Sequence, residues 1–267
     1  MPLARADLES LLRTRRLDRT LTTALPVDDP GTGLGSPAIA PTDIGPLDAH
    51  LGGGFPRGQL SEIVGTRSSG RTSLLLQFLA AATGRGELVA LVDALDAFDV
   101  ASAGAAGIQL DRLLWVRGHV VSNPGLCRDM NQRALDQAIR AFSLVLQAGN
   151  FGIVALDLAE APADAIRRLP FTTWLRLQRQ IEGSQTVGVL IGNEPMARSS
   201  AGLTLRLGIR NSAVATGGIR FGPRLFDGFD LEARVVRARA LERARLRRGS
   251  GAPGVDDVRV HLSTTCA

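Results

Sequence analysis

The chain has 267 residues, of which 45% are apolar, and this is enough for a domain with a sizeable hydrophobic core. Its two cysteines, Cys127 and Cys266, exclude a disulfide framework, and its three histidines lack the spacing of a metal site. No apolar segment is long enough for a membrane helix or a secretory signal, so we expect a cytoplasmic protein with no membrane partner. The formal net charge of +5 favours an acidic partner, although part of it reflects the use of arginine in place of lysine throughout.

The two ends of the chain are expected to lie outside the compact domain. Residues 1–25 predict a basic N-terminal helix with a partial apolar stripe. Residues 26–43 predict a flexible linker, because they are rich in proline and glycine and have no periodicity. Residues 248–267 contain glycine, serine and threonine and predict a disordered tail.

Residues 44–247 predict one α/β domain in which strands and helices alternate. Apolar segments predict strands over 59–64, 88–92, 151–156, 187–191, 203–209 and 231–236. Apolar stripes at helical spacing predict helices over 72–83, 133–148 and 171–181. Because the strands are apolar throughout, we expect a mostly parallel sheet that is flanked by helices on both faces.

A glycine-containing segment, GTRSSGRT at 65–72, has the spacing of a phosphate-binding loop between a strand and a helix. In such a loop backbone N–H groups surround a phosphate, and the helix N-terminus adds positive potential. Lysine is expected at position 71, and a planar guanidinium is bulkier than an ammonium group. The loop is therefore either a phosphate site that positions its ligand badly or a strand–turn–helix connection whose glycines serve backbone geometry. The candidate nucleotide-binding residues here are Gly65, Ser68, Ser69, Gly70, Arg71, Thr72 and Ser73.

Asp157 is a further candidate, because it ends the apolar segment FGIVALD at 151–157. An aspartate at the end of a strand behind a phosphate-binding loop holds the Mg²⁺ of a bound nucleotide. If ATP binds, the hydroxyl of Thr72 and the carboxylate of Asp157 would hold its Mg²⁺. If it does not, the protein needs no cofactor.

Three stretches resemble the RecA family: LDAHLGGG at 47–54, GQLSEIVG at 58–65 and SSGRTSLLLQFLAAA at 68–82. The likeness continues through LVALVDALDAFD at 88–99 and fades after about residue 192. It implies a RecA-like fold with an ATP site. It also places the N-terminal helix where RecA relatives dock on a neighbouring subunit, so the helix has two interpretations, self-association into a homo-oligomer or a fraying basic tail.

The positions that the resemblance assigns to ATP hydrolysis depart from the RecA pattern. The glutamate that activates water corresponds to Leu95, which cannot accept a proton, with Asp96 beside it. Asp99 matches an aspartate on the adenine side, but the aromatic residue that stacks on the base corresponds to Ser102. The nucleotide-sensing glutamine corresponds to Glu194, whose carboxylate would repel a γ-phosphate. We therefore do not expect an efficient ATPase.

Two other stretches, RRLPFTTWLRLQRQIEG at 167–183 and PRLFDGFDLEARVVRAR at 223–239, resemble ImuA, a group of RecA-like accessory proteins of bacterial mutagenic translesion synthesis. This resemblance implies an adaptor in an error-prone repair complex of the SOS response to DNA damage. The implied partners are an ImuB-type inactive Y-family polymerase, a DnaE-type error-prone polymerase and RecA.

Other interpretations stay open. The seven arginines at 234–248 favour weak DNA binding, but they also suit a solvated strand edge and helix face. The loop and Asp157 suit a DNA-dependent ATPase or recombinase paralogue with a modified P-loop. The RecA-like core also suits a SulA-like inhibitor of cell division.

Overall fold

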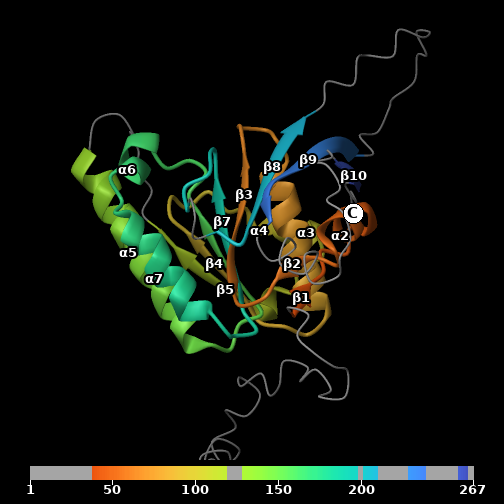
Figure 1. Ribbon diagram of the computed structural model, residues 1–267, viewed down its shortest axis with the longest axis horizontal. Coiled ribbons are helices and arrows are strands. Elements are labelled where there is room, and N and C mark those ends of the chain that lie inside the picture. Colours follow the sequence, from red (N-terminus) through yellow and green to blue (C-terminus); the bar gives the residue numbers. More distant parts are fainter. Residues whose placement is uncertain (1–37, 119–127, 198–200, 210–227, 239–257, 264–267) are drawn as a thin grey trace, which may run out of the picture. The chain divides into compact units, whose positions relative to one another are not determined.

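The computed structural model describes residues 38–118, 128–197, 201–209, 228–238 and 258–263, which belong to the compact unit Gly35–Ala267 (Figure 1). Within these ranges no helix is both long and apolar enough to cross a bilayer. The helices are α2 (Gly45–Leu51), α3 (Arg71–Gly84), α4 (Val100–Ala105), α5 (Arg128–Ala148), α6 (Ala163–Arg167) and α7 (Phe171–Ile181), with a 3-10 turn at Leu110–Arg112. The strands are β1 (Ile39–Ala40), β2 (Phe55–Pro56), β3 (Gln59–Gly65), β4 (Val89–Asp93), β5 (Leu113–Arg117), β6 (Ile153–Asp157), β7 (Val187–Gly192), β8 (Leu203–Ile209), β9 (Gly228–Ala238) and β10 (Val258–Ser263).

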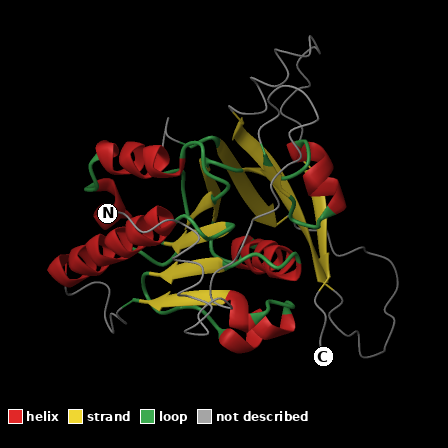
Figure 2. Cartoon of the chain, turned by 90° about the horizontal axis from the view of Figure 1, so that it is seen from below, coloured by secondary structure: helices red, strands yellow, loops and turns green. Residues whose placement is uncertain are grey.

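Eight of these strands form one sheet in the order β10-β9-β8-β3-β7-β6-β4-β5. Neighbours from β8 to β5 run parallel, whereas β8, β9 and β10 pair antiparallel. One apolar cluster joins α5, α6 and α7 to one face of the sheet, and another joins α2, α3 and α4 to the opposite face (Figures 1 and 2). The predicted α/β fold, a mostly parallel sheet flanked by helices, is confirmed.

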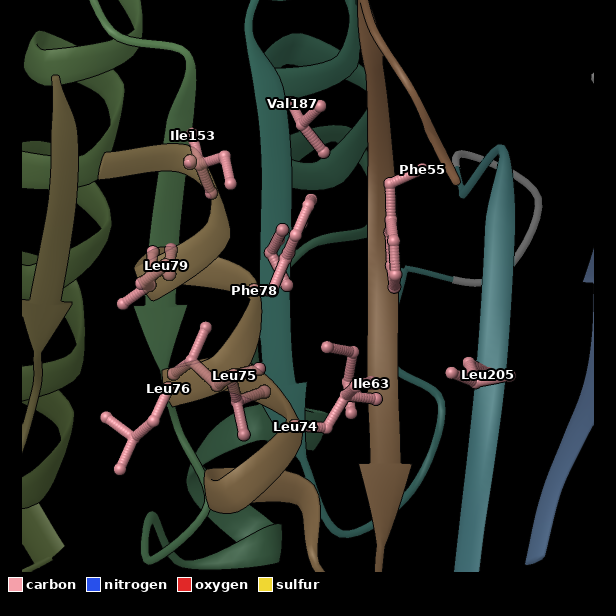
Figure 3. Close-up of a cluster of buried hydrophobic side chains, with 14 of the residues drawn as sticks. Phe55, Ile63, Leu74, Leu75, Leu76, Phe78, Leu79, Ile153, Val187 and Leu205 are labelled. Carbon is pink, nitrogen blue, oxygen red and sulfur yellow. The ribbon is translucent and has the colours of Figure 1, made fainter. Parts of the chain in front are cut away.

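Helix α3 is buried on almost all sides. Phe78 stacks on Phe55 of β2 with ring centroids 4.7 Å apart. The leucines of α3 face Ile63, Ile153 and Val187 of three neighbouring strands (Figure 3). Since each fully buried leucine or phenylalanine contributes about 1.5–3 kcal/mol, the start of α3 is held firmly against the sheet.

The structure corrects both predicted ends of the domain. Ile39 and Ala40 pair antiparallel with β2, and Ala40 is fully buried, so the ordered domain begins before residue 44. Val258–Ser263 forms β10, which pairs with β9, so the prediction of disorder is wrong for this part of the tail. Its sequence VRVHLS alternates apolar and polar residues as a strand does, but it is short and follows a glycine-rich segment. The predicted N-terminal helix, most of the linker and the arginines beyond residue 238 lie outside the described residues.

Candidate nucleotide-binding site

Residues 65–73 connect β3 to α3 at the edge where the parallel strands end. Ligands of open α/β sheets bind at this edge. The strand register places Asp157 of β6 between Asp93 of β4 and Ile191 of β7, and β7 in turn lies beside β3. The structure therefore brings Asp157 to the edge of the sheet that carries the predicted loop.

The backbone of the loop keeps the shape of a phosphate cradle. Ser68 and Gly70 adopt left-handed conformations, with φ of 63° and 85°. Gly70 is the N-cap of α3, so the loop leads straight into a helix N-terminus. Left-handed residues just ahead of a helix form an anion-binding concavity. Thr72 is exposed and Ser73 is half-buried in the first turn of α3, so the hydroxyl proposed for Mg²⁺ is accessible.

Packing alone requires a glycine at position 65. A Cβ there would lie 2.3 Å from the Oγ of Ser69 and 2.7 Å from the carbonyl oxygen of Leu207 in β8. Both separations are much shorter than van der Waals contact, and one neighbour is backbone that cannot move away. The glycine is needed for β3, the loop and β8 to approach each other, whether or not a phosphate binds.

Arg71 turns its side chain into the protein, and only 6% of that side chain is exposed. Its Nη1 donates hydrogen bonds to the carbonyl oxygens of Gly65, at 2.5 Å, and Gly192, at 3.3 Å, and to Oδ1 of Asn193. Its Nη2 lies 3.5 Å from a carboxylate oxygen of Glu160. We call these contacts the Arg71 network. In these contacts the N–H donors of the guanidinium are paired with protein oxygens, which lie at the start of the loop and at the ends of β6 and β7.

The Arg71 network decides how well the site fits ATP and Mg²⁺. The γ-phosphate of a bound nucleotide needs a cation that faces it. Here the cation is already bound to carbonyl groups and a carboxylate, and Asn193 donates a further hydrogen bond of 2.9 Å to the carbonyl oxygen of Ala159. The backbone of the loop fits a phosphate, but the guanidinium of Arg71, bound to protein oxygens, does not fit the place of a cation that faces the γ-phosphate.

Asp157 is a carboxylate with an unusual pKa. Burial raises its pKa to about 6, and the nearby carboxylates of Asp93 and Glu160 add to this effect. A hydrogen bond of 2.8 Å from the backbone N–H of Ala159 and the charge of Arg71 act in the opposite direction. The carboxylate therefore destabilises the folded state when it is ionised.

Asp157→Asn is accordingly expected to stabilise the protein at neutral pH by about 2–3 kcal/mol, since the amide oxygen can still accept the hydrogen bond. The pKa of about 6 in the folded protein lies above the ordinary value of 3.8. The destabilisation of the wild type by ionised Asp157 is therefore complete above pH 6 and disappears as the pH falls towards 3.8. Urea unfolding of both proteins at neutral pH and at about pH 4 measures this difference.

A control for this prediction is Asp96→Asn. The hydrogen bond from Arg117 lowers the pKa of Asp96, so its ionised form favours folding and its replacement should not stabilise the protein. An Asp157→Asn variant whose advantage was the same at both pH values would contradict the explanation.

Two carboxylates follow Leu95 in the described part of the chain, Asp96 and Asp99. Leu95 is half-buried and packs against the apolar cluster under α5. Asp96, with φ of 57°, accepts two hydrogen bonds from Arg117 at 2.7 and 2.8 Å. Asp99 caps α4 by accepting hydrogen bonds of 2.8 Å from the backbone N–H of Ser102 and 2.5 Å from its hydroxyl. Each carboxylate is therefore engaged in a local structural contact.

Glu194 does not stand as an isolated negative charge. It forms an ion pair of 2.6 Å with Arg206 of β8, and the hydrogen bond from Arg206 lowers the pKa of Glu194. The expected repulsion of a γ-phosphate is therefore partly neutralised. The ion pair fastens the segment after β7 to β8.

Asp93, Glu160 and Asn193 belong to the site although the sequence did not point to them. Asp93 is buried, and it accepts hydrogen bonds of 3.0 and 2.8 Å from the backbone N–H groups of Ala97 and Phe98. It ends the apolar segment VALVD just as Asp157 ends IVALD, so the same signal could have identified it. Glu160 and Asn193 follow strands in loops, and no local pattern predicts that they meet Arg71.

Comparison with known proteins agrees with this geometry. Residues 38–158 match the family model described as the RecA N-terminal domain. This part of the chain is RecA-like. The match covers both α2 and the P-loop and ends just after Asp157, so it contains most of the candidate site but not the segment after β7.

Individual RecA proteins are similar over limited lengths. Protein RecA of Acholeplasma laidlawii is 37% identical over 116 residues, which are 43% of this chain and 31% of that protein. Protein RecA of Clavibacter michiganensis is 36% identical over 125 residues, or 46% of this chain and 31% of that protein. Protein RecA of Methylococcus capsulatus is 28% identical over 225 residues, or 74% of this chain and 60% of that protein. The chain is thus a distant homologue that spans about a third of the first two relatives.

Proposed function

We propose that this protein is a RecA-like accessory protein of DNA repair, which acts as an adaptor in an error-prone translesion-synthesis complex without efficient ATP hydrolysis. The Arg71 network carries the proposal. A working P-loop directs its cation at the terminal phosphates, whereas Arg71 is bound to protein oxygens on two sides of the loop. Leu95, packed in an apolar cluster, supports the same conclusion.

The adaptor role rests on the resemblance of 167–183 to the ImuA group. That stretch contains the end of α6 and all of α7, which cover one face of the sheet together with α5 (Figure 1). The proposed partners are an ImuB-type inactive polymerase, a DnaE-type error-prone polymerase and RecA. DNA binding through the basic stretch from Arg234 is a second, weaker contact in this proposal.

A DNA-dependent ATPase or recombinase paralogue is the alternative that a specific observation favours. The left-handed Ser68 and Gly70 keep the phosphate-cradle backbone, and Thr72 is exposed. In this alternative ATP binding would displace Arg71 from its protein contacts.

Co-purification with the two polymerases, with and without ATP, tests the proposal together with phosphate release. We expect the complex to assemble equally well in both conditions, and single-stranded DNA to leave phosphate release at background. Assembly that required ATP, or release that rose strongly with single-stranded DNA, would show the alternative to be right. Capture of a tubulin-like division protein instead of the polymerases would support a SulA-like role.

A further inference from the structure

Residues 193–197, the segment after β7, are attached to the neighbouring strands by two sets of contacts. Glu62 of β3 accepts hydrogen bonds of 2.7 Å from the two backbone N–H groups at the end of the segment. Arg206 of β8 pairs with Glu194 at 2.6 Å, but both side chains are partly exposed, so this pair contributes little. Neither set of contacts reaches the loop at 65–73.

Arg71 connects this segment to the loop. Its guanidinium donates hydrogen bonds to the carbonyl oxygen of Gly65, where the loop begins, to that of Gly192, which ends β7, and to Oδ1 of Asn193. Among the side chains of the described residues, Arg71 alone joins the loop to the end of β7 by hydrogen bonds. The side-chain connection between the loop and the segment therefore depends on this one residue.

The amide of Asn193 is engaged at both of its polar atoms. Its Oδ1 accepts the hydrogen bond from Arg71, and its Nδ2 donates one of 2.9 Å to the carbonyl oxygen of Ala159, in the loop after β6. The backbone N–H of Ala159 in turn donates a hydrogen bond of 2.8 Å to Asp157. An amide whose donor and acceptor are both paired is held in one orientation. Asn193 therefore links Arg71 to the ends of both β6 and β7.

We propose that Arg71 and Asn193 form an internal tether, which takes the place of a nucleotide in holding the loop and the segment after β7 together. In nucleotide-driven switches, contacts with the terminal phosphate and its Mg²⁺ order the neighbouring segments. Here a guanidinium whose side chain is only 6% exposed makes the connection with protein groups alone. The segment after β7 therefore keeps one conformation with or without a nucleotide.

A ligand in the loop is not expected to order the segment further. A ligand shifts a conformational equilibrium only as far as it binds one state better than the other. For Arg71 to face a phosphate, it would have to leave the buried carbonyl groups of Gly65 and Gly192 as well as Asn193. Contact with the loop backbone alone would leave the tether unchanged.

This inference deepens the proposed function, and it rests on that function only in the point that ATP does not drive the protein. An adaptor whose segment after β7 was loose would still assemble with polymerases, and a tethered protein could have other partners. The experiment uses the protein alone, without a partner and without a hydrolysis assay. Its outcome is therefore independent of polymerase capture.

Hydrogen–deuterium exchange of the full-length protein, measured by mass spectrometry, tests the tether. The reporters are the amides of Met196 and Ala197, whose hydrogen bonds to Glu62 break when the segment opens. Asn193→Ala should speed their exchange about tenfold, because the segment then opens without breaking the tether. Glu194→Gln is the matched control in the same segment. It weakens only the exposed ion pair and should change the exchange by less than about threefold.

A double variant shows whether the two residues act through one contact. Arg71→Met should speed the same exchange at least as much as Asn193→Ala, and combining the two should cause little further change. Circular dichroism and urea unfolding verify that each variant is folded. A further measurement needs no variant: ATP with Mg²⁺ should leave the exchange of residues 193–197 in the wild type unchanged.

Three results would overturn the proposal. The first is an Asn193→Ala variant that exchanges no faster than Glu194→Gln. The second is a double variant whose increase in exchange is the product of the two single increases, since Arg71 and Asn193 would then act independently. The third is slower exchange of residues 193–197 in the wild type when ATP is added, which would show that a nucleotide, and not Arg71, orders the segment.

Discussion

Arg71→Met should destabilise the protein by about 3 kcal/mol, because methionine keeps the length of the side chain but donates no hydrogen bond. The carbonyl oxygens of Gly65 and Gly192 and the side chain of Asn193 would each lose a donor in a buried place. An unsatisfied buried polar group costs about 1–3 kcal/mol, and water entering the loop would recover part of this. Urea unfolding, followed by tryptophan fluorescence, measures the change.

Arg67→Met is the matched control, since Arg67 lies in the same loop and is exposed. It should change stability by less than about 0.5 kcal/mol. If Arg71→Met were as stable as Arg67→Met, the Arg71 network would not hold the loop, and the argument against ATP hydrolysis would lose its main support.

Arg71→Lys separates the two roles of this position. A lysine ammonium cannot span the same set of acceptors, so part of the stability should be lost, while the loop backbone keeps its phosphate-cradle shape. We expect calorimetry to detect ATP binding in this variant without hydrolysis, because Leu95 still lacks a base. Hydrolysis by Arg71→Lys alone would mean that the rest of the site is intact.

Glu62→Ala is expected to lower the free energy of unfolding by about 3–5 kcal/mol, a larger loss than the one expected for Arg71→Met. Glu62 is fully buried in β3, and its carboxylate accepts hydrogen bonds of 2.7 Å from the backbone N–H groups of Met196 and Ala197. The hydroxyl of Thr204 donates a third, at 2.8 Å. Without the carboxylate two buried N–H groups and one hydroxyl are left without an acceptor.

Thr204→Val provides the comparison, because it removes one of these donors and leaves the other two hydrogen bonds in place. It should cost about 1–2 kcal/mol, measured by urea unfolding alongside Glu62→Ala. Equal stability of Glu62→Ala and wild type would mean that the segment after β7 is held by other contacts.

Much of the fold could be read from local patterns. Periodicity predicted β3, α3, β6, α7 and β8 almost to the residue, because each is a long apolar or amphipathic segment. Short elements such as α4 and α6 were missed, since five or six residues carry too little periodicity. β10 was missed for the same reason.

The candidate site, like the fold, could be predicted from the sequence only in part. Spacing alone identified the loop at 65–73 and Asp157, because a P-loop and a strand-end aspartate are local signatures. The resemblance to RecA implies that Leu95 stands where a catalytic glutamate is expected, and this position lies within the family match over 38–158. The sequence also showed that position 71 is arginine, but not where its side chain points.

The sequence by itself therefore determined the RecA-like sheet, the place of the loop and the loss of its lysine. Only the tertiary structure decided that Arg71 binds Gly65, Gly192 and Asn193, and that Glu62 anchors the segment after β7. The reason is physical. Backbone elements follow from residues close in the chain, whereas a buried charge is satisfied by whichever polar groups the folded sheet brings within hydrogen-bond distance.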